Sequence, residues 1–206
     1  MTCCTTYDLC IPQRETFTRI LRWSLLPYIY KAITGITATA PAVVTAVGHG
    51  LPDGWRVAVV SAGGMRQINA GHNPPISSEY HKATVLTADT VALNDVNAAS
   101  YTAYTSGGYL QFYSPASLAG YTAKFTVWAT DADAAAGNTP LLTVTTSTSA
   151  PLSSITLDDT AKTITLLISE TDVAALTWTT GFYELVLVAS DGTTTELLGG
   201  TVTVGD

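Results

Sequence analysis

Charged side chains are scarce in this sequence. Asp, Glu, Lys and Arg make up 12% of the 206 residues, against about 25% in an ordinary soluble domain. The nine basic residues are scattered, with one loose group between Arg14 and Lys31, and the formal net charge is −7. A nucleic-acid partner requires clustered Lys and Arg that displace counterions from phosphates. The composition therefore argues against DNA or RNA binding.

Long apolar runs are missing as well. The best candidate, residues 20–33, is interrupted by Arg22, Pro27 and Lys31, and it is shorter than the roughly 20 apolar residues that cross a bilayer. The first ten residues lack a basic region followed by an apolar core, which is the pattern of a signal peptide. We therefore expect neither a signal peptide nor membrane insertion.

Cysteine is rare and unevenly placed. The three cysteines, Cys3, Cys4 and Cys10, crowd the amino-terminal end. Their number is odd and their spacing offers no fourth metal ligand, so neither a disulfide framework nor a zinc site is supported. We expect free thiols in a reducing cytosol, and the sequence leaves their role open.

Known catalytic signatures do not occur. The sequence has no Gly-x-Ser-x-Gly elbow, P-loop or dinucleotide fingerprint, so we expect neither an enzyme nor a cofactor. Glu79 and His81 offer two metal ligands, but His49 lies in a turn where backbone hydrogen bonding explains it and His72 lies beside prolines. No metal site is predicted. A Ser, a His and an Asp brought together by folding would make a hydrolase, which stays an open alternative.

The acidic residues have simpler explanations than chemistry. Asp131 and Asp133 precede Gly137 and Asn138, but the ligand spacing and the closing Glu of a calcium loop are missing. We interpret residues 131–140 as a solvated acidic loop. Glu170 and Asp172 follow Ser169, where a helix cap explains them.

The residues that replace charge are Thr, Ala, Val, Leu and Gly, which favour β structure. The clearest strand covers residues 119–128, where Tyr121, Ala123, Phe125 and Val127 alternate with polar residues. Its predicted partner is residues 16–23, about a hundred positions upstream. Residues 24–30, which contain Pro27, are predicted to be a packed connector.

The middle of the chain reads as a separate unit of about seven short strands, including predicted strands at residues 65–69, 101–105 and 109–113. A hairpin is predicted across residues 82–93. The last third predicts a hairpin at residues 154–168, a short helix that Ser169 caps, and a final hairpin that turns at Asp191-Gly192. Ile164, Leu166 and Ile168 should share one face, as should Tyr183, Leu185 and Leu187.

Two family resemblances follow from these segments. Tyr7-Asp8-Leu9, Ile11-Pro12-Gln13, Leu21-Arg22-Trp23, residues 118–125, residues 164–169, residues 181–185 and residues 200–204 resemble the amino-terminal domain of tailed-phage baseplate upper proteins. The glycine-rich pieces at residues 48–51, 63–65 and 104–108 resemble the small β module of phage proteins that is named after the first catalytic cysteine half-domain (FCCH) of ubiquitin-activating enzymes. Residues 32–112 contain no Cys, so ubiquitin chemistry is not implied.

The resemblances imply an all-β chain in two domains. An Ig-like β-sandwich would comprise residues 1–31 and 113–206, and an FCCH-like β module, residues 32–112, would be inserted between its first two core strands. The implied role is a non-enzymatic structural protein of a bacteriophage virion, made in the host cytoplasm and located in the tail tip, baseplate or collar. The implied partners are other tail, baseplate or fibre proteins and further copies of this chain in a cyclic homo-oligomer, with host-surface contact.

Aromatic residues offer the candidate interaction surface, because aromatic side chains are enriched at interface cores. The candidates are Trp55, Tyr101, Tyr104, Tyr109, Trp128 and Trp178. An exposed platform of Tyr101, Tyr104 and Tyr109 would instead favour a carbohydrate- or receptor-binding module. Ordinary core packing of the tryptophans and a capsid decoration role both remain open.

Overall fold

The chain folds into two compact units whose regular secondary structure is mostly β-strand. The computed structural model describes residues 7–146 and 153–205, and 48% of the chain is strand against 9% helix. Unit 1 is drawn from Met1–Trp23 and Ser117–Asp206, and unit 2 is the continuous segment Ser24–Ala116. The predicted all-β class is confirmed at this level. Cys3 and Cys4 lie outside the described residues, and Cys10 is an exposed free thiol.

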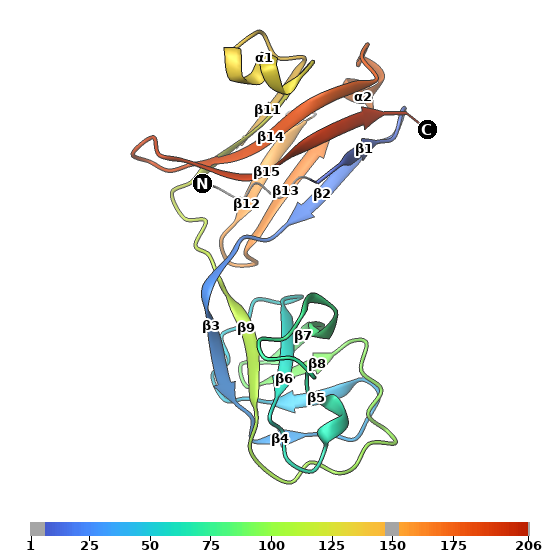
Figure 1. The fold of residues 1–206 in the computed structure, drawn as a ribbon, viewed down its shortest axis with the longest axis vertical. Coiled ribbons are helices and arrows are strands. Elements are labelled where there is room, and N and C mark those ends of the chain that lie inside the picture. The colour runs from blue at the N-terminus through green and yellow to red at the C-terminus, as the bar shows by residue number, and fades with distance from the viewer. Residues whose placement is uncertain (1–6, 147–152, 206) are drawn as a thin grey trace. The chain divides into compact units, whose positions relative to one another are not determined.

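Unit 1 contains two sheets, whose strands are labelled in Figure 1. The larger has the strand order β1-β15-β14-β10-β11, and the smaller has the order β12-β13-β2. All neighbouring strands are antiparallel except β1 and β15, which run parallel. The strands are β1 (Leu9–Ile11), β2 (Phe17–Leu21), β10 (Thr122–Trp128), β11 (Leu142–Thr145), β12 (Ser154–Asp158), β13 (Thr163–Ile168), β14 (Thr180–Val188) and β15 (Thr194–Val204).

One hydrophobic core joins the two sheets of unit 1. Ile164, Leu166 and Ile168 of β13 belong to the same buried cluster as Phe125 of β10 and Tyr183 of β14. The rings of Phe125 and Tyr183 lie 5.4 Å apart. Alternation along each strand places these side chains on one face, as the sequence predicts for β13 and β14.

The predicted pairing of residues 16–23 with residues 119–128 is wrong. β2 pairs with β13, and its Phe17 lies opposite Ile168. β10 pairs with β11 and β14 instead. The two segments belong to different sheets and meet only through side chains in the shared core, which a pattern of alternation does not distinguish from direct pairing.

Two short helices complete unit 1. The predicted cap is confirmed for α2 (Glu170–Ala174), where the Ser169 side chain accepts a hydrogen bond from the Asp172 amide. Residues 131–140 are not simply a loop, because they contain α1 (Asp131–Ala136). The Thr130 side chain caps α1 and Gly137 ends it with a left-handed backbone. Among the described residues, no helix has the length and apolar content to cross a membrane.

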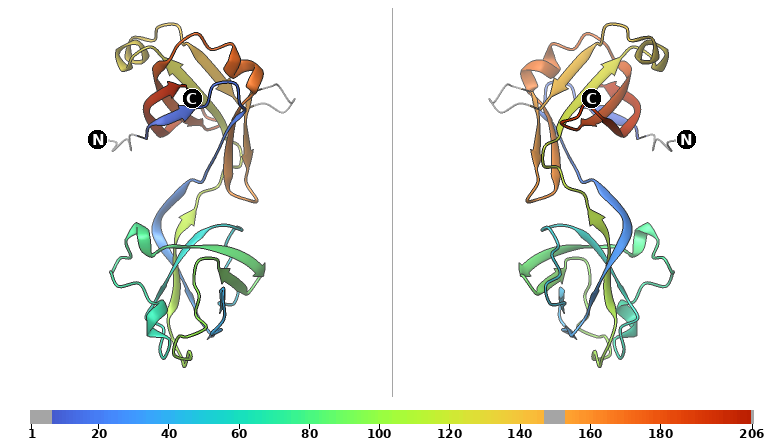
Figure 2. Two further views of the ribbon diagram at one scale, coloured as in Figure 1. Left: turned by 90° about the vertical axis from the view of Figure 1, so that its right-hand side faces the viewer. Right: turned by 90° about the vertical axis from the view of Figure 1, so that its left-hand side faces the viewer.

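Unit 2 is one curled, seven-stranded sheet, a half-barrel that is seen from two sides in Figure 2. Its strand order is β3-β9-β6-β7-β8-β5-β4, and all its strand pairs are antiparallel. The predicted hairpin at residues 82–93 is confirmed as β7 and β8. The elements are β3 (Ser24–Ala32), β4 (Gly35–Ile36), β5 (Ala42–Thr45), β6 (Arg56–Val60), η1 (Arg66–Ile68), η2 (Ser77–Glu79), β7 (His81–Thr87), β8 (Thr90–Leu93) and β9 (Tyr109–Pro115).

Three predicted elements of unit 2 are corrected by the structure. Residues 24–30 are not a connector but part of the nine-residue strand β3, which pairs with β9 on both sides of a register shift between Leu25 and Tyr28. Residues 65–69 contain the 3₁₀ helix η1 rather than a strand. Residues 101–105 form no strand. Pro27 is tolerated because β3 is an edge strand, where a missing amide donor costs least.

The two glycine-rich pieces of unit 2 contact each other. The Gly63 amide donates to the Ser106 carbonyl (2.8 Å), and the Thr105 amide donates to the Gly63 carbonyl (3.0 Å). Gly108 has φ +87°, and a Cβ at this position would lie 2.8 Å from the Ala62 backbone. Gly108 is therefore required both by its conformation and by the close approach of two chain segments, and Gly63 by the close approach alone.

Candidate functional site

A row of tyrosines on the β3–β9 ribbon forms the most distinctive surface of unit 2. Tyr28 lies opposite Tyr113, Tyr30 opposite Gln111, and Ala32 opposite Tyr109. Cross-strand partners share a face, and successive residues alternate between faces. The opposite face of the ribbon therefore carries Ile29, Leu110 and Phe112, which pack in or against the core.

The tyrosine rings contact one another along this face. Tyr28 and Tyr113 have ring centroids 4.7 Å apart, and the Tyr28 hydroxyl donates to the Tyr113 hydroxyl (3.2 Å). This hydrogen bond is the main reason that the pKa of Tyr28 is raised. Tyr80 packs 5.7 Å from Tyr113, and Tyr30 meets Tyr109 edge to face at 6.3 Å. The half of the row nearer Tyr109 is the more open, since Tyr30 is 50% exposed and Tyr109 46%.

A cavity of about 390 Å³ opens beside Tyr30 and Tyr109. We call it the tyrosine pocket. Gln111, His72 and Asn73 also line it. This volume lies within the range of about 300–1,000 Å³ that is typical of small-molecule sites. None of the described residues that line the pocket is Asp, Glu, Lys or Arg.

Gln111 is an unusual lining residue for such a pocket, because it is a polar residue that is almost fully buried. It is 1% exposed, and its amide nitrogen Nε2 has no hydrogen-bond partner among the described residues. The neighbouring Tyr80 hydroxyl is buried and also lacks a partner there. Burial raises the pKa of Tyr80 to about 12, and the nearby Gln111 amide acts to lower it, although no hydrogen bond of ordinary geometry joins the two side chains. A buried donor without a partner costs about 1–3 kcal/mol.

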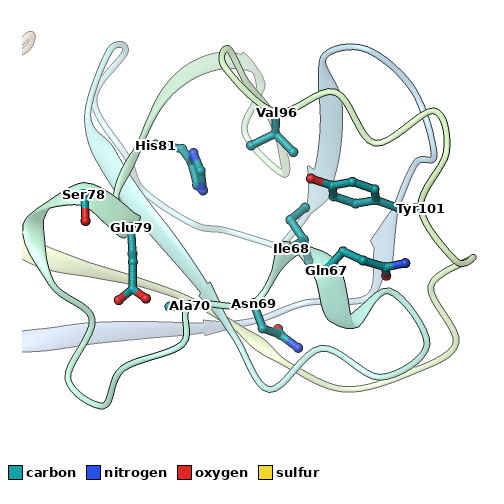
Figure 3. Close-up of a pocket in the computed structure, with 9 residues that line it drawn as sticks. All are labelled: Gln67, Ile68, Asn69, Ala70, Ser78, Glu79, His81, Val96 and Tyr101. Carbon is teal, nitrogen blue, oxygen red and sulfur yellow. The ribbon is translucent and has the colours of Figure 1, made fainter.

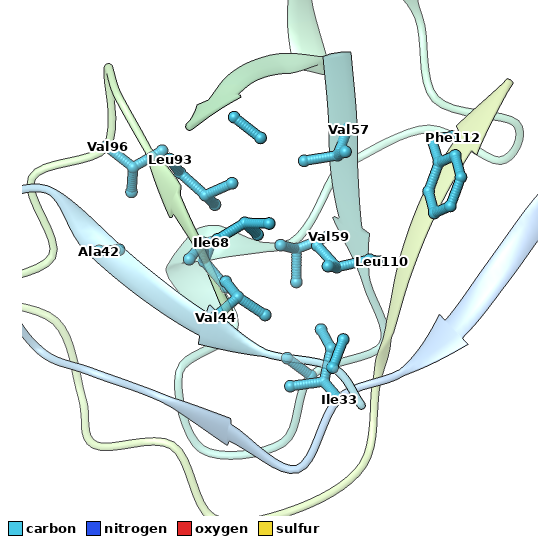
Figure 4. Packing of buried hydrophobic residues seen from close by; sticks show 14 of the residues in the cluster. Ile33, Ala42, Val44, Val57, Val59, Ile68, Leu93, Val96, Leu110 and Phe112 are labelled. Atoms are coloured by element: carbon cyan, nitrogen blue, oxygen red, sulfur yellow. The ribbon is translucent and has the colours of Figure 1, made fainter. Parts of the chain in front are cut away.

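A second, smaller cavity of about 190 Å³ lies between η1 and β7. In Figure 3, Ser78 and Glu79 lie on one wall and Gln67 and Tyr101 on the other. Ile68 and Val96 line the same cavity and also belong to the hydrophobic core, as Figure 4 shows. This cavity is therefore partly a surface opening of the packed core.

Glu79 organises the loop beside both cavities. Its carboxylate accepts hydrogen bonds from the His72 ring (2.9 Å) and from the amides of Gly71 (2.7 Å) and Ile76 (2.9 Å). The bond from His72 is the largest cause, followed by the bond from Ile76, of a pKa lowered to about 2. With three donors already bound, the carboxylate holds the loop at residues 71–79 in place and has little capacity for acid-base chemistry.

The three histidines contact separate partners. Glu79 pairs with His72, whereas His81 pairs with Asp95 (3.0 Å). Glu79 and His81, the two metal ligands that the sequence offers, therefore have different partners. His49 bonds to the Thr87 carbonyl and the Leu51 amide, which is the backbone role predicted for it. Among the described residues, no hydrogen bond joins Ser78 to His81, and no group of three His, Cys, Asp or Glu side chains is placed to hold a metal ion.

The predicted aromatic surface does not form a single patch. Trp55 is 3% exposed, and its indole donates to the Tyr113 carbonyl (3.0 Å), so its assignment to a surface is wrong. Tyr101 and Tyr104 pack partly against the core, and the Tyr104 hydroxyl donates to the Ile33 carbonyl (3.0 Å). Tyr109 belongs to the tyrosine pocket and is exposed there.

The two remaining tryptophans lie in unit 1. The Trp128 indole donates to the Asn138 carbonyl (3.2 Å) beyond α1. Trp178 packs partly against the core of unit 1, and its buried Nε1 has no partner among the described residues. Both are half-buried, so each keeps some accessible ring surface.

Sequence reasoning missed Tyr30 and Gln111. The signal was present in the alternation of Tyr28 and Tyr30 with Ile29, but Pro27 hid the strand. In the sequence, Gln111 is indistinguishable from an exposed polar residue, because its burial depends on β6, which pairs beside it, and on the nearby Tyr80, both distant in the chain.

Comparison with known proteins leaves these residues as the main guide to function. No protein-family model matches the sequence, and no curated protein matches it significantly. The family resemblances stated from the sequence therefore stay predictions.

Proposed function

We propose that this chain is a non-enzymatic structural component of a tailed-phage virion, located in the tail tip, baseplate or collar. Unit 1 would be an Ig-like sandwich that docks on the tail, and unit 2 an inserted FCCH-like module that meets neighbouring tail or fibre proteins. A cyclic homo-oligomer fits this role, because tail parts surround a symmetric tube.

One observation carries the proposal. The segments that resemble the baseplate family lie on both sides of unit 2 in the sequence, yet they assemble into one unit with one core. Leu9 pairs with Val202, and Thr18 pairs with Leu167. The intervening segment, which resembles the second family, has its own separate core. The segments that resemble one family thus fold together, and the segment that resembles the other family has a core of its own.

Unit 1 also offers a surface for self-assembly. β2 lies at one edge of the three-stranded sheet, and its Ile20 is 61% exposed. An edge strand that exposes a large apolar residue is a template for pairing with another chain. We propose β2 as part of the contact between copies.

The test is the solution mass of the purified chain, measured by light scattering over a concentration series. A discrete trimer or hexamer supports a symmetric virion part, and a monomer at every concentration contradicts the cyclic oligomer. Ile20→Lys should dissociate the oligomer. Thr201→Lys adds the same charge at an exposed position of β15, an interior strand, and should leave the mass unchanged. Equal dissociation by both variants would argue against β2 as the contact.

A further inference from the structure

We infer that β2 of one copy pairs in parallel with β12 of the next copy, so that the three-stranded sheet of unit 1 continues from copy to copy. This pairing rests on the proposed function, in which β2 is part of the contact between copies, and it names the surface that meets β2. Because β2 and β12 are different surfaces, the contact is heterologous and closes into a ring where its rotation allows, whereas β2 paired with β2 would give only a dimer.

The strands β2 and β12 form the two edges of the three-stranded sheet (Figure 1). Both pair antiparallel with β13, so they run in the same direction. A second copy displaced across the sheet therefore presents its β12 to β2 in parallel, and the hydrogen bonds of a parallel ladder form between them. Thr146 bridges to Ile155 near the start of β12, whereas Thr156 and Asp158 beyond it are exposed.

Opposite charges on the two edges favour β2 with β12 over β2 with β2. Residues 17–22 contain Arg19 and Arg22 but no Asp or Glu, and residues 154–159 contain two aspartates but no Lys or Arg. Arg19 contacts the Tyr7 side chain and forms no salt bridge among the described residues. Like charges directly opposite each other destabilise a strand pair, so two β2 strands side by side would repel.

The pairing within each copy defines the register between copies. Thr156 of β12 lies opposite Thr165 of β13, and Thr165 lies opposite Ile20 of β2, so the three residues form one row across the sheet. A copy added without a shift along the strands therefore places its Thr156 beside Ile20. Ile20 is 61% exposed, and this contact covers it.

The next two positions of this register match side chains of the same face. Leu21 meets Leu157 of the next copy on the core side, where both already pack partly against the core. Arg22, which follows β2, meets Asp158 of the next copy on the solvent side. Within its own copy, Asp158 accepts the amides of residues 160 and 161 through Oδ1 alone among the described residues, so Oδ2 faces the new partner. Apolar pairs and pairs of opposite charge both stabilise neighbouring strands.

The experiment measures the mass of the full chain by light scattering over a concentration series. Thr156→Lys puts a charge on the exposed side of β12 without changing β2, and should raise the dissociation constant by about tenfold or more, as a lysine on an edge strand opposes pairing. Thr201→Lys is the matched control on β15 and should leave the dissociation constant unchanged. Urea unfolding checks that each variant folds.

A pair of substitutions in one chain tests the register. Ile20→Lys alone should dissociate the oligomer. Ile20→Lys together with Thr156→Glu places opposite charges across the contact and should restore association to within about threefold of the wild type. Asp158→Asn keeps an acceptor for the turn amides but removes the charge, so it should weaken association by about threefold and reduce its dependence on salt.

The outcomes separate this pairing from the cyclic oligomer. A discrete ring that survives Thr156→Lys overturns the pairing and leaves the ring standing. A mass that grows without limit and falls with Thr156→Lys supports the pairing and contradicts a closed ring. A dimer that Ile20→Lys dissociates and Thr156→Lys does not indicates β2 with β2 and overturns the pairing. A monomer at every concentration overturns both.

Discussion

Tyr183 sits in the centre of unit 1, and its environment explains an unusual pKa. The side chain is fully buried, and its hydroxyl donates to the Tyr7 carbonyl (2.5 Å). Burial is the main cause that raises the pKa of Tyr183 from 10.0 to about 12. The hydroxyl ties the segment before β1 to β14 and stays protonated in the folded state.

The first prediction concerns Tyr183→Phe. Loss of the hydrogen bond should lower the unfolding free energy by about 1 kcal/mol at neutral pH. Because the pKa is raised on folding, the stability that it confers is complete below about pH 10 and is lost as pH rises towards about 12. In urea unfolding at several pH values, the unfolding free energy should therefore fall less at alkaline pH in the variant than in the wild type. Tyr109→Phe, at an exposed tyrosine, is the control and should change the midpoint little.

The second prediction concerns acid stability through Glu79. Its pKa is lowered from 4.5 to about 2, chiefly by the hydrogen bond from His72. A lowered pKa gives stability above about pH 4.5 that disappears as pH falls towards about 2. Glu79→Gln should unfold more easily at about pH 6 and differ less from the wild type at about pH 3. Glu15→Gln, at an exposed residue of unit 1, controls for the loss of one charge. A constant difference at all pH values would contradict this account.

At the scale of elements, the glycine pairs of unit 2 join loops that are distant in the sequence. Gly107 and Gly108 both have left-handed backbones, at φ +67° and +87°. A Cβ on Gly107 would meet only the Ser61 carbonyl at 3.9 Å, whereas one on Gly108 would meet Ala62 at 2.8 Å. The two positions thus share conformational strain and differ in available space.

The third prediction compares Gly107→Ala with Gly108→Ala. Gly107→Ala should cost about 1–2 kcal/mol from the left-handed conformation alone. Gly108→Ala should cost clearly more, because backbone atoms of Ala62 would have to move. Thermal or urea unfolding of the two variants measures the difference. Equal losses of unfolding free energy in the two variants would show that the loops move apart around the new Gly108→Ala methyl group at no cost.

Hairpins are the elements that the sequence predicts well. Each of β7–β8, β12–β13 and β14–β15 combines alternating apolar residues with a local turn, so a short continuous segment specifies the pairing. The partner of β2 is β13, across most of the chain, and nothing in the residues of β2 specifies it. The turn at Asp191 is local in this sense, since its carboxylate accepts from the Thr193 amide (2.8 Å).

The helix caps show a finer limit of sequence reasoning. Ser169 caps α2 as predicted, but the Asp172 carboxylate does not reach the Ser169 amide directly. That amide donates to the Ser153 hydroxyl (3.0 Å), which in turn donates to Asp172. For α1, Thr130 and Gly137 were readable as start and stop signals. The Asp-rich composition instead favours the interpretation of residues 131–140 as an acidic loop.

The candidate site was less predictable than the fold. Tyr109 is predicted from its residue type, and Trp55, Tyr101 and Tyr104 are predicted for the same reason, but Trp55 is buried and the other two pack partly against the core. Exposure depends on which face of an element meets the core, and residues 101–105 have no regular alternation to reveal it. The pocket needs β3, β9 and the loop at residues 70–73 together, a juxtaposition that only the fold provides.

At the scale of the whole molecule, unit 2 has the properties of an independent domain. Its buried cluster is drawn entirely from residues between Ile33 and Phe112. Its two ends are neighbours, because Ser24 at the start of β3 lies opposite Pro115 at the end of β9. Exposed insertion points with adjacent ends tolerate whole domains best.

The fourth prediction is that residues 24–116 fold when produced alone. We expect a single cooperative urea transition and a dispersed NMR spectrum. The shorter piece 32–112 lacks nearly all of β3 and the end of β9, and should be less stable because it loses the Tyr28–Tyr113 contact and the packing of Ile29. Equal stability of the two pieces would place the domain boundary at residues 32 and 112 instead.

The adjacent ends of unit 2 also affect how unit 1 forms. β2 must find β13 across a chain segment that includes all of unit 2, and the entropy lost on closing a loop grows with its length. Once β3 and β9 have paired, the residues of unit 2 add little to the length of that loop, because Ser24 and Pro115 lie opposite each other. Unit 2 then shortens the search that limits folding of sheets with distant partners. We therefore expect the middle of the chain to fold first and its two flanks second.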